Sequence, residues 1–136
     1  GLVYVNGFAP EHGESAFQLG AMFPGSTLAD AASAYPVSTG GNEFAIRQDA
    51  FHQQFAADVP AAQAAVMGAA QRQATEAALS EPLPTDAPAW QHVPSWFVFG
   101  DQDLIIPVAL HRFMAERAGA KARRELAGAS HAPSVS

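Results

Sequence analysis

The absences in this 136-residue chain restrict what it can be. It contains no cysteine, which excludes disulfide bonds, thiolate chemistry and cysteine-ligated zinc. No run of about eighteen apolar residues and no charged segment leading into an apolar one is present, so we expect neither a membrane span nor a secretory signal. Lysine and arginine total 7 against 13 acidic residues, and the net charge of −6 argues against a nucleic-acid partner. We therefore expect a cytoplasmic protein that binds neither nucleic acid nor membrane.

Metal-binding patterns are also missing. The histidines at four positions show no His-x-x-x-His or Glu-x-x-x-His spacing, namely His12, His52, His92 and His111. We therefore expect no metal, and no motif in the chain implies a cofactor.

Apolar residues in both halves of the chain predict strands that alternate with helices. Residues 2–5 favour a strand, and the continuous apolar run at 93–99 is typical of a strand buried on both faces. A helix is expected over 107–119, followed by a weaker strand at 123–126. This order favours an α/β fold with a mainly parallel sheet.

The middle of the chain is expected to be largely helical. Ser15 is placed to cap a short helix, whereas residues 26–41, with many small side chains, are expected to be irregular. Residues 44–46 suggest a short strand or an extended turn, and helices are predicted over 49–57 and 61–79. We divide the chain into a first core strand with its following loop and helix (1–43), a helical insertion (44–81) and a C-terminal core (82–136).

Side chains with acid–base chemistry follow two of the predicted strands. Asp101 and Asp103 come directly after the strand at 93–99, and His131 follows the strand at 123–126. In a parallel α/β sheet, sites form at the carboxyl ends of the strands, so these groups are expected to lie together. An aspartate that holds an imidazole fixes its tautomer and stabilises the imidazolium formed when a nucleophile loses its proton.

These segments resemble the α/β-hydrolase superfamily. Gly-Asp-Gln-Asp at 100–103, followed by Ile-Pro at 106–107, looks like the acid loop of that superfamily, and Gly-Ala-Ser-His at 128–131 looks like its histidine loop. Residues 2–10 are similar to the strand after the nucleophile helix, and residues 44–79 would then form the helical cap. The resemblance is closest to the small esterase and hydroxynitrile-lyase-like branch and covers nearly the whole chain as a C-terminal half.

The resemblance implies a role for each candidate residue. Asp103 would be the triad acid, Asp101 a turn residue and His131 the general base. Phe8, which follows the carboxyl end of the first strand, and Ile105, beside the acid, are candidates for contact with a small ester substrate.

Other apolar side chains of the predicted cap fit two interpretations. Phe51, Phe55 and Met67 could line an acyl pocket, although aromatic pairs at helical spacing usually belong to a core.

The nucleophile of such an enzyme is not found in the sequence. The family needs a Gly-x-Ser-x-Gly elbow and an oxyanion loop ahead of the strand at 2–5. Ser15 lies in Gly-Glu-Ser-Ala-Phe after the wrong strand, and Ser26 and Ser130 fit no better. The chain also begins in a strand and stops soon after His131, so we expect a fragment that is inactive alone.

Two classes of function therefore stay open. The first is the C-terminal part of a serine hydrolase of the carboxylesterase type, with a hydroxynitrile-lyase-like activity as its alternative. The second is a non-catalytic fragment or assembly module, in which the exposed first strand pairs with a missing N-terminal half or with another copy.

Overall fold

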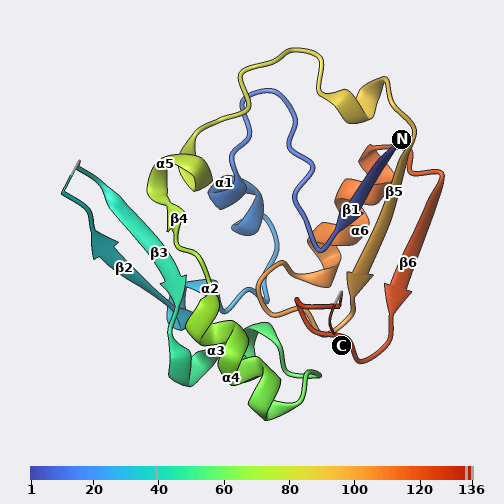
Figure 1. The fold of residues 1–136 in the computed structure, drawn as a ribbon. Helices are drawn as coiled ribbons and strands as arrows, with labels where there is room; N and C mark the ends of the chain where they lie inside the picture. Colours follow the sequence, from blue (N-terminus) through green and yellow to red (C-terminus); the bar gives the residue numbers. More distant parts are fainter. Residues whose placement is uncertain (39, 134, 136) are drawn as a thin grey trace.

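The computed structural model describes residues 1–38, 40–133 and 135, and it contains a parallel and an antiparallel sheet (Figure 1). In chain order the helices and strands are β1 (Leu2–Val5), α1 (Ala16–Gly20), α2 (Leu28–Ala31), β2 (Ala32–Pro36), β3 (Asn42–Ile46), α3 (Gln48–Phe55), α4 (Ala61–Ala70), β4 (Ala74–Thr75), α5 (Glu76–Ser80), the 3-10 helix η1 (Ala89–Gln91), β5 (Ser95–Gly100), α6 (Val108–Arg117) and β6 (Ala122–Leu126). No helix among the described residues is both long and apolar enough to cross a membrane.

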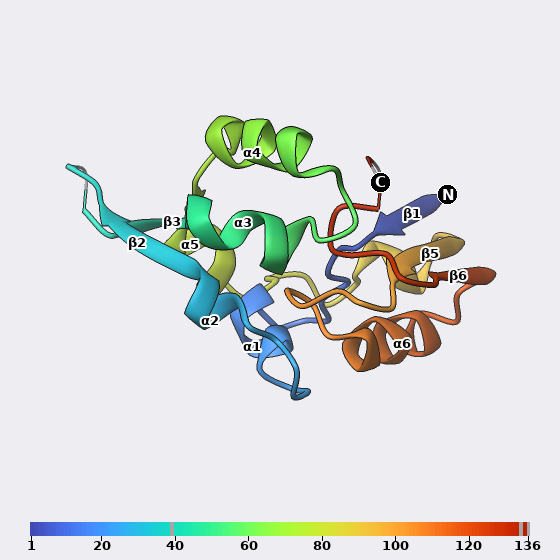
Figure 2. The same ribbon diagram turned by 90° about the horizontal axis from the view of Figure 1, so that it is seen from below.

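The parallel sheet contains the first and last strands of the chain and has the order β1-β5-β6. Tyr4 of β1 pairs with Phe97 of β5, and their rings stack with centroids 4.5 Å apart. Helix α6 lies along one face of this sheet (Figure 2), where Leu110 and Met114 are buried with Phe97 and Phe99. The predicted α/β architecture with a mainly parallel sheet of core strands is confirmed.

The opposite face of the parallel sheet is exposed in the described chain. Val3 and Trp96 occupy the same row and are 68% and 39% exposed, and Val5 is 47% exposed. The prediction that 93–99 is buried on both faces is therefore wrong for this chain. The apolar run reflects one face packed on α6 and a second apolar face that nothing described here covers.

The antiparallel sheet lies away from the parallel one and has the order β2-β3-β4. Residues 26–41 were expected to be irregular, but they contain α2 and β2, so that expectation is wrong. Strand β2 is rich in alanine and serine and ends at Pro36, which are weak strand formers, and it is formed by pairing with β3 over 42–46. The alternative of a short strand at 44–46 is confirmed.

Helices α3 and α4 pack against each other beside this sheet (Figure 2). A Cβ on Gly68 of α4 would lie 3.1 Å from Cγ of Phe51, so glycine allows the helices to approach. The expected helix over 61–79 is interrupted after Ala70. There Gln71 accepts a hydrogen bond from the backbone N–H of Ile46 at 2.9 Å and donates one to its carbonyl at 2.7 Å, which ties the end of α4 to β3.

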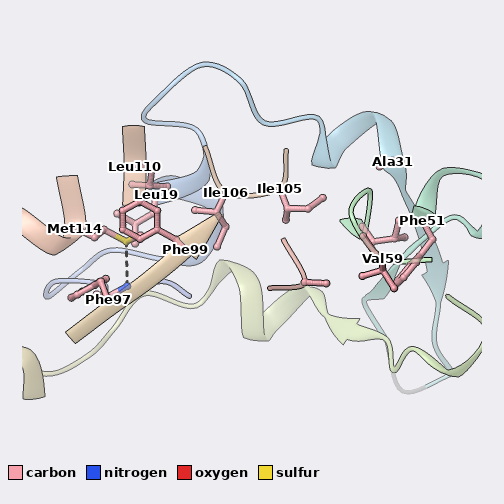
Figure 3. Close-up of a cluster of buried hydrophobic side chains, with 14 of the residues drawn as sticks. Leu19, Ala31, Phe51, Val59, Phe97, Phe99, Ile105, Ile106, Leu110 and Met114 are labelled. Carbon is pink, nitrogen blue, oxygen red and sulfur yellow. Dashed lines mark hydrogen bonds between the residues drawn. The ribbon is translucent and has the colours of Figure 1, made fainter. Parts of the chain in front are cut away.

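A continuous group of buried apolar side chains runs from the parallel sheet and α6 to α3, beside the antiparallel sheet. Figure 3 shows Phe99, Leu110 and Met114 at one end of this group and Phe51 at the other. Ile106, which follows the acid loop, lies between them and is 2% exposed. The loop after β5 is therefore anchored in the core on both sides of Asp103.

Candidate active site at the carboxyl ends of the parallel strands

The loops after β5 and β6 are joined by backbone and side-chain hydrogen bonds. The Asp101 carboxylate accepts a hydrogen bond from the Gly128 N–H at 2.8 Å, and the Gln102 N–H donates to the Ala129 carbonyl at 3.0 Å. These contacts hold the loop that carries Asp103 against the loop that carries His131. Asp101 has the position of a turn residue that links the two loops.

Gly100 allows the two loops to approach closely. A Cβ at this position would lie 2.1 Å from the Ala129 carbonyl oxygen and 2.5 Å from that of Ser130. Both contacts are with backbone, which cannot rotate away as a side chain can. The glycine at the end of β5 is therefore required by the packing of the histidine loop on this strand.

Asp103 and His131 are in direct contact. Nδ1 of His131 lies 2.8 Å from Oδ2 of Asp103. Because the carboxylate can only accept, Nδ1 carries the proton, and Nε2 is the basic nitrogen of the neutral ring. The Phe55 ring meets His131 edge-on, with centroids 4.6 Å apart, so α3 packs on the imidazole. This arrangement can orient a histidine for proton transfer at Nε2.

Asp103 is buried, at 4% exposure, and accepts hydrogen bonds from five donors of the described chain. The N–H groups of Ile105 and Ile106 donate to Oδ1 at 2.8 and 2.9 Å. Oδ2 accepts from Asn6 Nδ2 at 2.9 Å, His111 Nε2 at 3.0 Å and His131 Nδ1 at 2.8 Å.

The hydrogen bonds keep this buried carboxyl ionised. Burial acts to raise the pKa of Asp103, but hydrogen bonds from His111 and His131, the electrostatic interaction with His131 and the Ile106 N–H outweigh it. The pKa is lowered from 3.8 to about 2. Asp103 is therefore an anion at neutral pH and acts only as an acceptor.

Two of these donors, Asn6 and His111, were not predicted as site residues. Asn6-Gly7 reads in the sequence as the end of a strand, and His111 as one of several histidines without metal spacing. The available signal for His111 was its place next to Leu110 in the predicted helix over 107–119. The structure shows that both side chains are fully buried. The signal for Asn6 was its place at the carboxyl end of a parallel strand, the edge at which Asp103 was expected.

His111 is held in one orientation by its surroundings. Its ring stacks on Phe99 with centroids 4.8 Å apart and planes 6° from parallel. Nε2 donates to Asp103, and Nδ1 has no hydrogen-bond partner among the described residues. The neutral Nε2–H tautomer suits this position, because a second N–H would be buried without an acceptor.

A largely apolar cavity of about 730 Å³ lies next to the acid loop. Phe8 and Ile105, the two predicted substrate-contacting residues, both line it. The rest of its wall comes from α1, the segment that leads through α2, strands β2 and β3, and α5. It includes Phe17, Phe23, Leu28, Phe44 and Leu79. The Ile105 N–H also donates to Asp103, so this cavity wall is bonded directly to the acid.

The other apolar candidates do not line this cavity. Phe51 is buried in the core, Phe55 packs on His131, and Met67 packs against the core from α4. A further cavity of about 560 Å³ lies between β3 and α4 and includes neither Asp103 nor His131.

The described residues supply neither a serine bonded to His131 nor a set of metal ligands. In the segments 1–38, 40–133 and 135, no serine hydroxyl is hydrogen-bonded to His131, and no group of three or more His, Asp or Glu side chains could hold a metal ion. Ser15 caps α1, and Ser130 is buried with its hydroxyl accepting from the Ala132 N–H at 3.3 Å. The hydroxyls of these two serines therefore form local hydrogen bonds with the backbone.

Comparison with known proteins defines the class of this fold. A model of the alpha/beta hydrolase family matches residues 1–136, and the chain belongs to this family. No curated protein sequence matches the chain.

Solved structures with the same fold are distant in sequence. A mutant of polyneuridine aldehyde esterase aligns with a TM-score of 0.72 at 15% identity, covering 98% of this chain and 55% of that one. A pyrethroid hydrolase from Sphingobium faniae aligns with a TM-score of 0.62 at 19% identity, covering 99% and 55%. A methylesterase from Arabidopsis aligns with a TM-score of 0.68 at 11% identity, covering 95% and 50%. The chain thus spans about half the length of each of these structures.

Proposed function

We propose that this chain is the C-terminal portion of a serine hydrolase of the carboxylesterase type and supplies the acid, Asp103, and the histidine, His131, of its catalytic triad. The observation that carries the proposal is the 2.8 Å contact between His131 Nδ1 and a buried, ionised Asp103. Membership of the alpha/beta hydrolase family supports it, because an acid–histidine pair at the ends of neighbouring strands has a defined use in that fold.

The proposed reaction uses the free nitrogen of His131. A serine hydroxyl attacks the ester carbonyl while Nε2 takes its proton, and the resulting imidazolium is stabilised by Asp103. Nε2 then returns the proton to the leaving alcohol as the carbon–oxygen bond breaks, leaving an acyl-serine. Water attacks this acyl group with His131 again as the base, which releases the carboxylic acid product and restores the serine.

We assign the nucleophile and the oxyanion hole to a part of the full-length protein beyond these 136 residues. The sequence contains no Gly-x-Ser-x-Gly elbow, and the solved structures that it matches are about twice as long. The chain alone is therefore expected to be inactive. The edge of β1 that faces away from β5, beside exposed Val3 and Val5, is the proposed pairing site for the missing N-terminal half or for another copy.

The substrate is proposed to be a small-molecule ester with an apolar group. The cavity beside the acid loop is large enough for a group of that kind and is lined mainly by aromatic and aliphatic side chains. Phe8 and Ile105 are the proposed substrate contacts, since both line this cavity and Ile105 is bonded to the acid.

The test replaces the proposed base in the full-length protein. His131→Ala should lower ester turnover by about 10⁴-fold or more, since no other group takes the serine proton. His92→Ala, a substitution of an exposed histidine, is the matched control and should leave turnover unchanged.

A fluorophosphonate probe, which labels activated serines, should label the full-length wild type and not the chain described here. Full turnover by His131→Ala would refute the assignment. Cyanide release from a cyanohydrin without ester turnover would assign a lyase, and absence of both activities and of labelling would assign a non-catalytic module.

A further inference from the structure

The side chain of Asn6, at the end of β1, contacts the last residue of β5 and the loops that follow β5 and β6. Asn6 directly follows β1, and its Oδ1 accepts a hydrogen bond from the N–H of Gly100, the last residue of β5, at 3.1 Å. Its Nδ2 donates to Oδ2 of Asp103 at 2.9 Å and to the carbonyl of Ser130 at 3.1 Å. One amide therefore contacts the acid loop and the residue that precedes His131.

The three partners of Asn6 require an amide. The Gly100 N–H can only donate, whereas the Asp103 carboxylate and the Ser130 carbonyl can only accept. One acceptor and two donors must therefore meet at position 6, and only one orientation of the amide satisfies all three. A carboxylate would place an oxygen against two acceptors, and an apolar side chain would leave all three partners unpaired.

The backbone at this position is specialised as well. Asn6 has a φ of 40°, the one positive φ of a non-glycine residue among those that the structure describes. Its N–H donates to the Val98 carbonyl at 3.0 Å, and the residue is 7% exposed. Asparagine and aspartate tolerate this conformation better than other side chains, so the turn at the end of β1 aims the amide into the site.

We propose that Asn6 is a positioning residue, which fixes Asp103 and the His131 loop relative to each other so that the imidazole is presented to the nucleophile. This inference rests on the proposed function. Asn6 touches neither the basic nitrogen of His131 nor the substrate cavity, so it acts through Asp103 and through the backbone of Ser130.

Two substitutions in the full-length protein test this role without straining the turn. Asn6→Asp keeps the size, the tolerance of positive φ and an oxygen for the Gly100 N–H, but it replaces the donor facing Asp103 by a charged acceptor. Asn6→Gly keeps the backbone conformation and removes all three side-chain hydrogen bonds. Turnover is measured per folded molecule, with the folded fraction taken from circular dichroism, so that loss of folded protein does not count as loss of catalysis.

Both variants should lower kcat about 10- to 100-fold with KM changed less than about twofold, because the chemical step and not substrate binding depends on the aligned pair. The titratable groups that face Asp103 are His111 from α6 and His131 from the loop after β6. A second carboxylate beside them favours the imidazolium of His131, so Asn6→Asp should also move the acidic limb of the kcat/KM profile about one pH unit upward.

The matched control is Ser95→Ala. Ser95 is buried at the opposite end of β5, 2% exposed, and its hydroxyl donates to the Val93 carbonyl at 3.0 Å. Its loss should lower stability and leave kcat and the pH profile unchanged. If His131→Ala is inactive while Asn6→Gly keeps a kcat per folded molecule within twofold of wild type, the positioning role is wrong. If His131→Ala stays active, the proposed function itself fails.

Discussion

Replacing Asp103 by asparagine removes the acceptor on which the site is built. The carboxylate accepts from the N–H groups of Ile105 and Ile106 through one oxygen and from Asn6, His111 and His131 through the other. An asparagine has one oxygen and one NH₂ group. If its oxygen faces the two backbone donors, its NH₂ group faces the three side-chain donors, and the histidines must change tautomer to accept from it.

This rearrangement leaves at least two buried donors without an acceptor. One hydrogen of Asn6 loses its partner, and His111 acquires an Nδ1–H where no described group can accept it. Each such group costs about 1 to 3 kcal/mol, so Asp103→Asn should lower the free energy of unfolding by about 2 to 6 kcal/mol at neutral pH. The depressed pKa gives an independent figure. A pKa of about 2 in the folded chain against 3.8 in the unfolded chain corresponds to about 2 kcal/mol.

The loss should depend on pH in a defined direction. Because the folded-state pKa of Asp103 is lower than its unfolded value, the stability that ionisation contributes is fully present above pH 3.8 and is lost as the pH falls through about 2. Asparagine does not titrate. The difference in unfolding free energy between wild type and Asp103→Asn should therefore be largest at neutral pH and shrink near pH 2.

The assay is urea unfolding followed by circular dichroism, at neutral pH and again near pH 2. Ester turnover of the full-length protein should also fall about 10⁴-fold, because the tautomer imposed on His131 places a hydrogen on the nitrogen proposed to act as the base. Asp101→Asn is the matched control in the same loop, since an amide oxygen can still accept from the Gly128 N–H. Equal stability of Asp103→Asn and wild type at neutral pH would refute this account of the site.

Three further substitutions probe the parts that surround the site. Gly100→Ala places a Cβ 2.1 Å from the Ala129 carbonyl oxygen, so thermal unfolding should show a loss of stability greater than the roughly 1 to 3 kcal/mol usual for overpacking. Turnover should fall at least about 100-fold, and unchanged turnover would contradict this account. Hydrogen bonds from Arg117 lower the pKa of Glu14 below its ordinary 4.5, so Glu14→Gln should lower the melting temperature at neutral pH, and this loss should shrink as the pH falls below 4.5. A loss that stays constant with falling pH would argue against this ion pair. Ser15→Ala removes the capping box of α1 and should cost about 1 kcal/mol in urea unfolding, with turnover unaffected.

Local sequence signals predicted the elements that depend on local chemistry. The cap at Ser15, the strands at 2–5 and 93–99 and the helix after Pro107 are formed where capping residues, β-favouring runs and proline indicate them. Strand β2 was missed because its alanines, serine and proline carry no strand signal, and it exists only through its pairing with β3. The break after Ala70 was missed because it depends on the contact of Gln71 with Ile46, 25 residues earlier.

The sequence by itself determined that an acid and a histidine follow two strands of a parallel sheet. Chain order and the geometry of α/β crossovers place such residues at one edge, which is why the sequence alone pairs Asp103 with His131. Only the tertiary structure decided what completes their surroundings. Asn6 is 97 residues away from Asp103 along the chain, and His111 reaches it from a helix face that also serves the core. Their roles depend on which donors meet which acceptors after folding, and no local pattern encodes that match.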